Sequence, residues 1–215
     1  MNSTLLLSGA AGNIEVWLDA PAESPRGIAL IGHPHPLMGG NANHKVPVTI
    51  ARVLQSMGYL VARPNFRGVG QSSGSHDHGN GETDDMMEVL RWLRSEYPNL
   101  PLVLAGFSFG TWVVTRVQER LHAQGIEVQT IMLTGTAVGE VDSGRIYNTP
   151  HPKGSTLIVH GEKDEIVPLN SVFDWAADQD RPVVVIAGAD HFFNRKLHIL
   201  KRIVTDHMTL VLNAG

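Results

Sequence analysis

The feature that most limits the fold is a set of short segments in which consecutive residues, rather than alternate ones, are apolar. They read IALIG from Ile28, LVLAG from Leu102 and TLIVHG from Thr156. A β-strand with apolar side chains on both faces must be covered on both faces. The sequence therefore predicts an α/β fold in which a mainly parallel sheet lies between layers of helices.

Apolar runs of this kind, or runs that alternate, recur along the whole chain and predict seven to eight strands. The expected strands are Thr4–Leu7, Ile14–Leu18, Gly27–Ile31, Tyr59–Ala62, Leu102–Ala105, Val128–Leu133, Thr156–Val159 and Val183–Ala187. No helical pattern separates the first two, so we expect them to form an antiparallel hairpin. Helical patterns that would cover both faces of the sheet span Lys45–Met57, Glu82–Glu96, Thr111–Ala123, Asn170–Asp178 and about Phe193–Leu212.

The length of 215 residues suits one domain, and we expect residues 1–215 to form a single domain. Thr134–Ser155 is rich in glycine and proline and predicts an irregular loop. No remaining segment is long enough to form a separate cap domain over the sheet.

Composition excludes several classes of function. The net charge is −4 without a Lys/Arg-rich run, so we expect no nucleic-acid partner and no binding to anionic membranes. The chain has no cysteine, which removes disulfides and thiolate catalysis. It has no apolar stretch near ~18 residues and no basic N-terminal region, so we expect a cytoplasmic protein. We expect this protein to be either a monomer or a homodimer.

A turn between a predicted strand and a predicted helix carries the clearest chemical signal. The strand ending at Ala105 is followed by Gly106-Phe107-Ser108-Phe109-Gly110 and then by a helix that begins near Thr111. This is the G-x-S-x-G nucleophile elbow in the strand–turn–helix context that it requires. We therefore expect Ser108 to be a nucleophile, with the Phe109 N–H at the helix start as one oxyanion-hole donor.

A serine hydroxyl needs a base to accept its proton, and histidine is the usual one. His191 lies just after the strand PVVVIAG and is the last histidine of the chain at a strand end. Asp164 follows the strand TLIVHG and lies between Ser108 and His191, in the order serine, acid, histidine. We predict His191 as the base and Asp164 as its orienting acid, with Glu162 and Glu165 as competing carboxylates.

Taken together, GFSFG, GEKDEIVP and GADHFF resemble the α/β-hydrolase superfamily. HPHPLMGG and NFRGVGQSSG narrow the resemblance to small, lidless bacterial serine hydrolases related to dienelactone hydrolase-like esterases. The resemblance implies a Ser108–His191–Asp164 triad, an acyl-enzyme intermediate and no cofactor. Asn65 departs from it, because many relatives of the wider superfamily carry a structural aspartate there.

The loop His33-Pro34-His35-Pro36-Leu37 follows the strand IALIG, where the second oxyanion-hole donor is expected. Proline has no N–H, so the donor is the backbone of His35 or Leu37. Leu37 is favoured because the second His-Pro pair resembles the family's usual His-Gly. Phe107 and Phe192 flank the expected catalytic residues and are candidates for substrate binding, although core packing is an equal alternative for Phe107.

These observations predict a serine hydrolase that cleaves small carboxylic ester or thioester bonds, with a small-molecule ester as its partner. One alternative is a metal-dependent hydrolase that uses the histidine-rich loops around His33, His35, His44 and His76-Asp77-His78. The prolines of the first loop and the serine turn argue against it, and the 76–78 segment also fits a solvated loop rim. The other alternative is a non-catalytic binding protein with an α/β-hydrolase-like fold.

Overall fold

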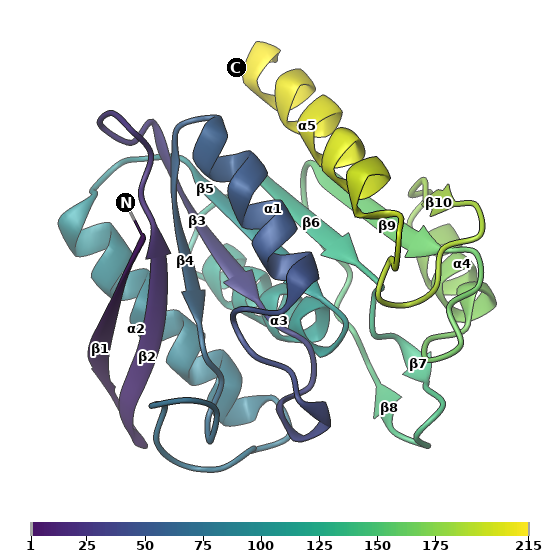
Figure 1. Ribbon diagram of the computed structural model, residues 1–215, viewed down its shortest axis with the longest axis horizontal. Helices are drawn as coiled ribbons and strands as arrows, with labels where there is room; N and C mark the ends of the chain where they lie inside the picture. The colour runs from purple at the N-terminus through teal and green to yellow at the C-terminus, as the bar shows by residue number, and fades with distance from the viewer. Residues whose placement is uncertain (1, 215) are drawn as a thin grey trace.

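The computed structural model describes residues 2–214, and within them one sheet has eight strands in the order β1-β2-β4-β3-β5-β6-β9-β10 (Figure 1). The strands span β1 Asn2–Gly9, β2 Gly12–Asp19, β3 Gly27–Gly32, β4 Tyr59–Pro64, β5 Leu102–Phe107, β6 Thr130–Thr134, β9 Thr156–Gly161 and β10 Val184–Ile186. β2 is antiparallel to both β1 and β4, whereas β4, β3, β5, β6, β9 and β10 run parallel. The predicted hairpin and the mainly parallel sheet are confirmed.

Helices cover both faces of this sheet. α1 (Lys45–Ser56) and α5 (Leu197–Asn213) pack on one face, the near face in Figure 1. α2 (Asn80–Glu96), α3 (Phe109–Ala123) and α4 (Leu169–Ala177) pack on the other. None of the helices between residues 2 and 214 combines the length and apolar character needed to cross a bilayer.

The two helical layers explain why the central strands are apolar at consecutive positions. In β3, Ile28 and Leu30 belong to the apolar cluster with α2 and α3, while Ala29 and Ile31 belong to the cluster with α1 and α5. Successive side chains of a strand point to opposite faces, so a strand between two apolar layers needs apolar residues at every position. All six residues of β3 and of β5 are buried accordingly.

The structure differs from the sequence prediction in two places. The segment expected as an irregular loop contains a short antiparallel hairpin, β7 (Gly139–Glu140) with β8 (Ile146–Tyr147). The last helix begins at Leu197 rather than near Phe193, because Phe193 and Arg195 adopt positive φ angles of 52° and 59° that a helix does not accommodate. The chain around these residues forms the loop that carries His191.

Parallel strands end at a common edge of the sheet, and their carboxyl ends meet where β7 and β8 lie (Figure 1). The loops after β3, β5, β9 and β10 lie at this edge and hold His35, Ser108, Asp164 and His191. In sheets of this kind, ligands bind beyond the carboxyl ends of the strands. The fold therefore brings together side chains that are far apart along the chain.

Candidate active site

Ser108 lies at the turn between β5 and α3 in a backbone conformation that an L-residue rarely adopts. Its φ is 54° and its ψ is −125°. Such a conformation costs roughly 1–3 kcal/mol and persists only where the surrounding structure enforces it. The Ser108 N–H donates to the Thr134 carbonyl at 3.0 Å, and the Thr111 N–H donates to the Ser108 carbonyl at 2.8 Å. The turn is thus held on both sides of the serine.

Two glycines make this tight turn possible, as the sequence pattern predicts. A Cβ on Gly106 would lie 2.6 Å from the carbonyl carbon of Gly110. A Cβ on Gly110 would lie 2.2 Å from the carbonyl oxygen of Gly32 in β3. Both contacts involve backbone that cannot move aside, so the start of α3 can approach β3 and β5 only because these positions lack side chains.

His191 and Asp164 form a hydrogen-bonded pair. His191 Nδ1 donates to Asp164 Oδ2 at 2.7 Å, and Asp164 Oδ1 accepts the backbone N–H groups of Ile166 at 3.0 Å and Val167 at 2.9 Å. A carboxylate can only accept, so the proton of a neutral His191 lies on Nδ1 and leaves Nε2 as a bare acceptor. That is the tautomer a general base needs.

The environment of Asp164 keeps it ionised. Burial by itself raises the pKa of this carboxyl, but the hydrogen bond from His191 and the backbone donor Val167 outweigh burial, and the pKa is lowered overall. An ionised Asp164 can therefore stabilise positive charge on His191.

The competing carboxylates do not contact His191. Glu162 accepts the backbone N–H of Gly188 at 2.6 Å, on the far side of the loop, and the side chain of Glu165 is exposed. The loop Asp164–Val167 points the Asp164 side chain back towards the sheet, because both of its backbone donors belong to the same loop.

Ser108 and His191 line one cavity of about 180 Å³ at the carboxyl edge of the sheet. Within residues 2–214 no hydrogen bond joins the Ser108 hydroxyl to His191 Nε2. Such bonds are often long in a site without substrate and shorten when the substrate binds. The cavity places the hydroxyl, the imidazole and the His191–Asp164 pair in one site.

The structure distinguishes the two candidates for the second oxyanion-hole donor. The Leu37 N–H already donates to His35 Nδ1 at 3.2 Å, and the Leu37 side chain is 71% exposed and outside the cavity. The His35 N–H has no hydrogen-bond partner among residues 2–214, and His35 lines the cavity beside Ser108. The preference for Leu37 is therefore corrected in favour of His35. The Phe109 N–H, at the start of α3, is also without a partner in the described chain.

Of the two phenylalanines proposed for substrate binding, only Phe192 lines the cavity, where it is 36% exposed. Phe107 is fully buried, and its ring packs against His191 and His44 with centroids 5.0 and 5.2 Å apart. Side chains alternate along β5, so Phe107 points into the layer of α1 and α5 and lies beneath His191. It supports the imidazole from below and does not reach the cavity.

His160 is a residue of the site that the sequence did not indicate. It is fully buried at the end of β9, and its Nε2 donates to the Val167 carbonyl at 3.0 Å while lying 3.2 Å from Asp164 Oδ2. Burial lowers the pKa of His160, so the ring stays neutral. Its Nε2 therefore lies beside the carboxylate that orients His191, while its proton is donated to the Val167 carbonyl. Its only sequence signal is its place at a strand end, four residues before Asp164.

In the segment His76-Asp77-His78, Asp77 and His78 are exposed, as expected of a solvated loop rim, but His76 is not. The His76 side chain is 7% exposed and its Nδ1 contacts Glu82 Oε1 at 2.8 Å. Glu82 is fully buried and also accepts the backbone N–H groups of Asp77 and Gly79. The His76 ring packs on His35 with centroids 4.6 Å apart, so this segment supports the loop that carries His35.

The histidine-rich loops do not form a metal-ligand set in the described residues. His33 Nε2 accepts the Phe66 N–H at 2.8 Å, and its Nδ1 donates to the Pro34 carbonyl at 2.7 Å. With both ring nitrogens engaged by backbone, His33 has no lone pair to offer a metal. Across residues 2–214, no three His, Asp or Glu side chains are grouped so that they could hold an ion.

Burial of neutral His33 predicts acid sensitivity of the fold. Desolvation is the main cause that lowers its pKa from 6.5 to about 3. Between these pH values the unfolded chain binds a proton at His33 that the folded chain does not. The stability that neutral His33 contributes to the fold is therefore fully present above pH 6.5 and declines as the pH falls towards 3. We expect the protonation of His33 in the unfolded chain to lower the free energy of unfolding by about 2 kcal/mol when the pH falls from 7 to 4.5.

Urea unfolding of the wild type and of His33→Gln at both pH values measures this effect. The variant should be less stable at pH 7, because it loses a buried hydrogen bond, but its loss on acidification should be smaller by about 2 kcal/mol. An equal loss in both proteins would contradict the assignment.

Asn65 has a structural role, as the comparison with the wider superfamily suggests. Its Oδ1 accepts the Ala42 N–H at 2.8 Å, and its Nδ2 donates to Glu15 Oε2 at 2.6 Å. Glu15 is buried on β2 and also accepts the Gln71 N–H at 3.0 Å. An aspartate at position 65 would put a second carboxylate against Glu15, and like charges at this distance repel. The amide of Asn65 avoids this repulsion because it can donate a hydrogen bond to Glu15.

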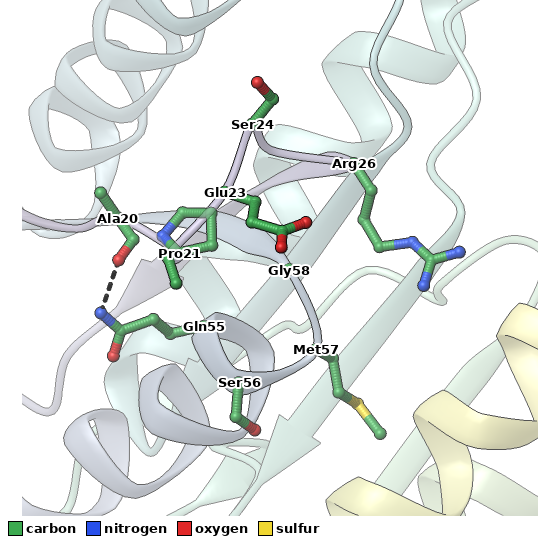
Figure 2. A pocket seen from close by; sticks show the side chains of 10 residues that line it. Ala20, Pro21, Glu23, Ser24, Arg26, Gln55, Ser56, Met57 and Gly58 are labelled. Atoms are coloured by element: carbon green, nitrogen blue, oxygen red, sulfur yellow. Dashed lines mark hydrogen bonds between the residues drawn. The ribbon is translucent and has the colours of Figure 1, made fainter.

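A second and larger hollow lies at the opposite end of the sheet, near the amino ends of β3 and β4. Figure 2 shows Arg26, Glu23 and Met57 around it, with Gln55 bonded to the Ala20 carbonyl at 2.8 Å. None of the predicted catalytic residues lines it. Its place at the amino ends argues against a role in the reaction, because ligands of such sheets bind at the carboxyl ends.

Comparison with known proteins agrees with the fold. Residues 37–151 match the family model described as alpha/beta hydrolase fold. A solved serine hydrolase without a lid from Xanthomonas campestris is 33% identical, with a TM-score of 0.85 over 97% of this chain and 94% of that one. The chain belongs to the α/β-hydrolase family, among its lidless serine hydrolases.

Other relatives differ in how much of their length is matched. An uncharacterised protein of Rickettsia prowazekii is 33% identical over 96% of this chain and 89% of its own length. Lysophosphatidylserine lipase of Gallus gallus is 31% identical over 77% of this chain, which spans half the length of that lipase. Dienelactone hydrolase of Anabaena variabilis, at 18% identity and a TM-score of 0.76, shares the fold.

Proposed function

We propose that this protein hydrolyses small carboxylic esters or thioesters through an acyl-enzyme intermediate on Ser108. The observation that carries the proposal is the 2.7 Å hydrogen bond between His191 Nδ1 and Asp164 Oδ2, in a site whose cavity also exposes Ser108 on its strained turn. Asp164 can hold the His191 ring in the tautomer that nucleophilic catalysis needs, with Nε2 as the acceptor.

In the proposed reaction, His191 Nε2 takes the proton of Ser108 as the hydroxyl oxygen adds to the ester carbonyl. The negative oxygen of the tetrahedral intermediate is held by the free N–H groups of Phe109 and His35. His191 then gives its proton to the departing alcohol, or thiol, and the acyl group remains on Ser108. Water, activated by the same imidazole, releases the acid and restores the serine.

The shape of the cavity supports a substrate with a small acyl group. Its volume of about 180 Å³ is below the roughly 300 Å³ at which pockets for drug-sized ligands begin. Apolar side chains at its rim, Met38 and Phe192, are 70% and 36% exposed. These side chains would contact the apolar part of an ester that extends out of the cavity.

A fluorophosphonate probe tests the proposal, since it phosphonylates only a serine that a base has activated. We expect the wild type to be labelled at Ser108 and to hydrolyse p-nitrophenyl esters of short acids, and Ser108→Ala to do neither. Ser75→Ala, which removes an exposed hydroxyl, serves as the matched control and should behave as wild type. A wild type that resists the probe and loses ester hydrolysis to a chelator would overturn the proposal.

A further inference from the structure

The β7–β8 hairpin brings a cation into the cavity that contains Ser108. Arg145 lies in the turn of this hairpin and lines the same cavity as Ser108 and His191. The proposed reaction of a neutral ester needs no cation there, because the oxyanion is held by backbone N–H groups. The presence of a guanidinium in this small cavity therefore calls for an explanation.

Arg145 has no acidic partner in the described part of the chain. No carboxylate of residues 2–214 lies within 4.0 Å of its guanidinium, and Asp142, which lines the same cavity, is outside that distance. The Arg145 Nε is buried and has no hydrogen-bond partner. By contrast, Arg63 and Arg67 each form a two-point contact with a single aspartate, Asp19 and Asp85.

The backbone holds Arg145 in place rather than leaving it on a free loop. The Val141 N–H donates to the Arg145 carbonyl at 2.9 Å, which closes the turn, and Gly144 supplies the positive φ of 73° that the turn needs. The Asp142 N–H donates to the Ile166 carbonyl at 2.9 Å, which ties the hairpin to the loop that carries Asp164. Arg145 is therefore fixed relative to the catalytic groups.

Apart from Asp142, the residues of the cavity near Arg145 are neutral or apolar. Ala137, Val141 and Ile166 line the same cavity. After burial, which raises the pKa of Tyr147, the charge of Arg145 and a hydrogen bond from its guanidinium lower the pKa of that phenol. Burial, followed by the charge of Arg145, lowers the pKa of His35 to about 4, so His35 stays neutral and does not compete for an anion. An anion that enters the cavity would meet a guanidinium that forms no ion pair within the described residues.

We propose that Arg145 binds a negatively charged group of the substrate, a carboxylate or a phosphate, and that the preferred esters of this protein are anionic. This inference rests on the proposed function, because it names the substrate class of the same site. A guanidinium presents a planar fork that matches both carboxylate and phosphate oxygens. A guanidinium that has no carboxylate partner in a partly dry cavity is stabilised by such a ligand more than by water.

Sets of related esters with and without an anionic group test the inference. The acyl-side pair is p-nitrophenyl butyrate and mono-p-nitrophenyl glutarate. The alcohol-side set is methyl 4-acetoxybenzoate, 4-acetoxybenzoate and 4-acetoxyphenyl phosphate, which separates carboxylate from phosphate. In at least one set we expect Arg145→Ala to lower kcat/KM for the anionic ester by about 10- to 100-fold, with less than about a twofold change for the neutral one.

Two further variants sharpen the measurement. Arg145→Lys keeps the charge but loses the fork and should fall between the wild type and Arg145→Ala. Arg202→Ala removes an exposed arginine of α5 and should leave the ratio of kcat/KM between anionic and neutral esters unchanged in every set. If Arg145→Ala alters anionic and neutral esters to the same extent in all sets, the inference is wrong while the proposed function stands.

Binding to the Ser108→Ala variant tests the inference independently of turnover. Isothermal titration with mono-p-nitrophenyl glutarate, 4-acetoxybenzoate and 4-acetoxyphenyl phosphate should give at least a tenfold weaker Kd for one of them when Arg145→Ala is added. An unchanged Kd for all three anions would overturn the inference, whether or not the wild type proves to be an esterase. Failure of fluorophosphonate labelling, by contrast, would count only against the proposed function.

Discussion

Replacement of Ser108 by alanine is expected to lower kcat for ester hydrolysis by about 10⁶-fold, and His191→Ala is expected to cost nearly as much. The reason is that the hydroxyl and the imidazole act as one unit, so neither retains much function without the other. The double variant should therefore be no slower than Ser108→Ala alone. Steady-state kinetics with a p-nitrophenyl ester measure all three variants, and what remains reflects binding and the two oxyanion-hole donors.

Two controls separate lost chemistry from lost structure. His198→Ala removes an exposed histidine of α5 and should keep wild-type kinetics. Thermal unfolding of Ser108→Ala should stay close to that of the wild type, since the hydroxyl makes no hydrogen bond within the described residues. Additive losses in the double variant would show that Ser108 and His191 act in separate steps. This result would contradict the proposed triad.

Asp164→Asn is expected to lower kcat by about 10⁴-fold with little change in KM. An amide at this position can turn its NH₂ towards His191 Nδ1, which would leave that nitrogen unprotonated and move the ring proton to Nε2. Nε2 could then no longer accept the proton of Ser108. The negative charge that stabilises protonated His191 would be lost as well.

Glu162→Gln and Glu165→Gln are the matched controls, because they neutralise the two carboxylates beside Asp164 without touching His191. Both should retain activity within about a factor of two, as expected of surface changes away from the chemistry. If Glu162→Gln or Glu165→Gln were as slow as Asp164→Asn, the assignment of the acid would be wrong. Kinetics at a pH where the wild type is fully active make the comparison direct.

Much of the fold could be predicted from local sequence patterns, because the spacing of apolar residues in a segment shows which of its faces are buried. Consecutive apolar residues in β3 and β5 indicated strands between two helical layers, and the structure has those layers. The absence of a helical pattern between the first two strands indicated the β1–β2 hairpin. The β7–β8 hairpin was missed because two-residue strands within a stretch rich in glycine and proline have no periodicity to detect.

The candidate site divides in a similar way. Ser108, Asp164 and His191 were predicted because each follows an apolar strand in a characteristic order, and the structure pairs Asp164 with His191. Leu37 was preferred over His35 on the analogy of a motif. That choice did not take account of the His35 side chain, which occupies the Leu37 N–H and leaves the His35 N–H free.

The positions of most strands along the chain, the serine turn and the three candidate catalytic side chains could be predicted from residues that are neighbours in the chain. Burial, periodicity and turn geometry act over a few residues, so they leave a local pattern. The approach of His160 to Asp164, the support of His35 by His76 and the entry of Arg145 into the cavity required the three-dimensional structure. Each of these contacts joins segments that meet only when the sheet assembles. Whether a donor or acceptor in them lacks a partner depends on all the residues around it, so no local pattern in the sequence indicates it.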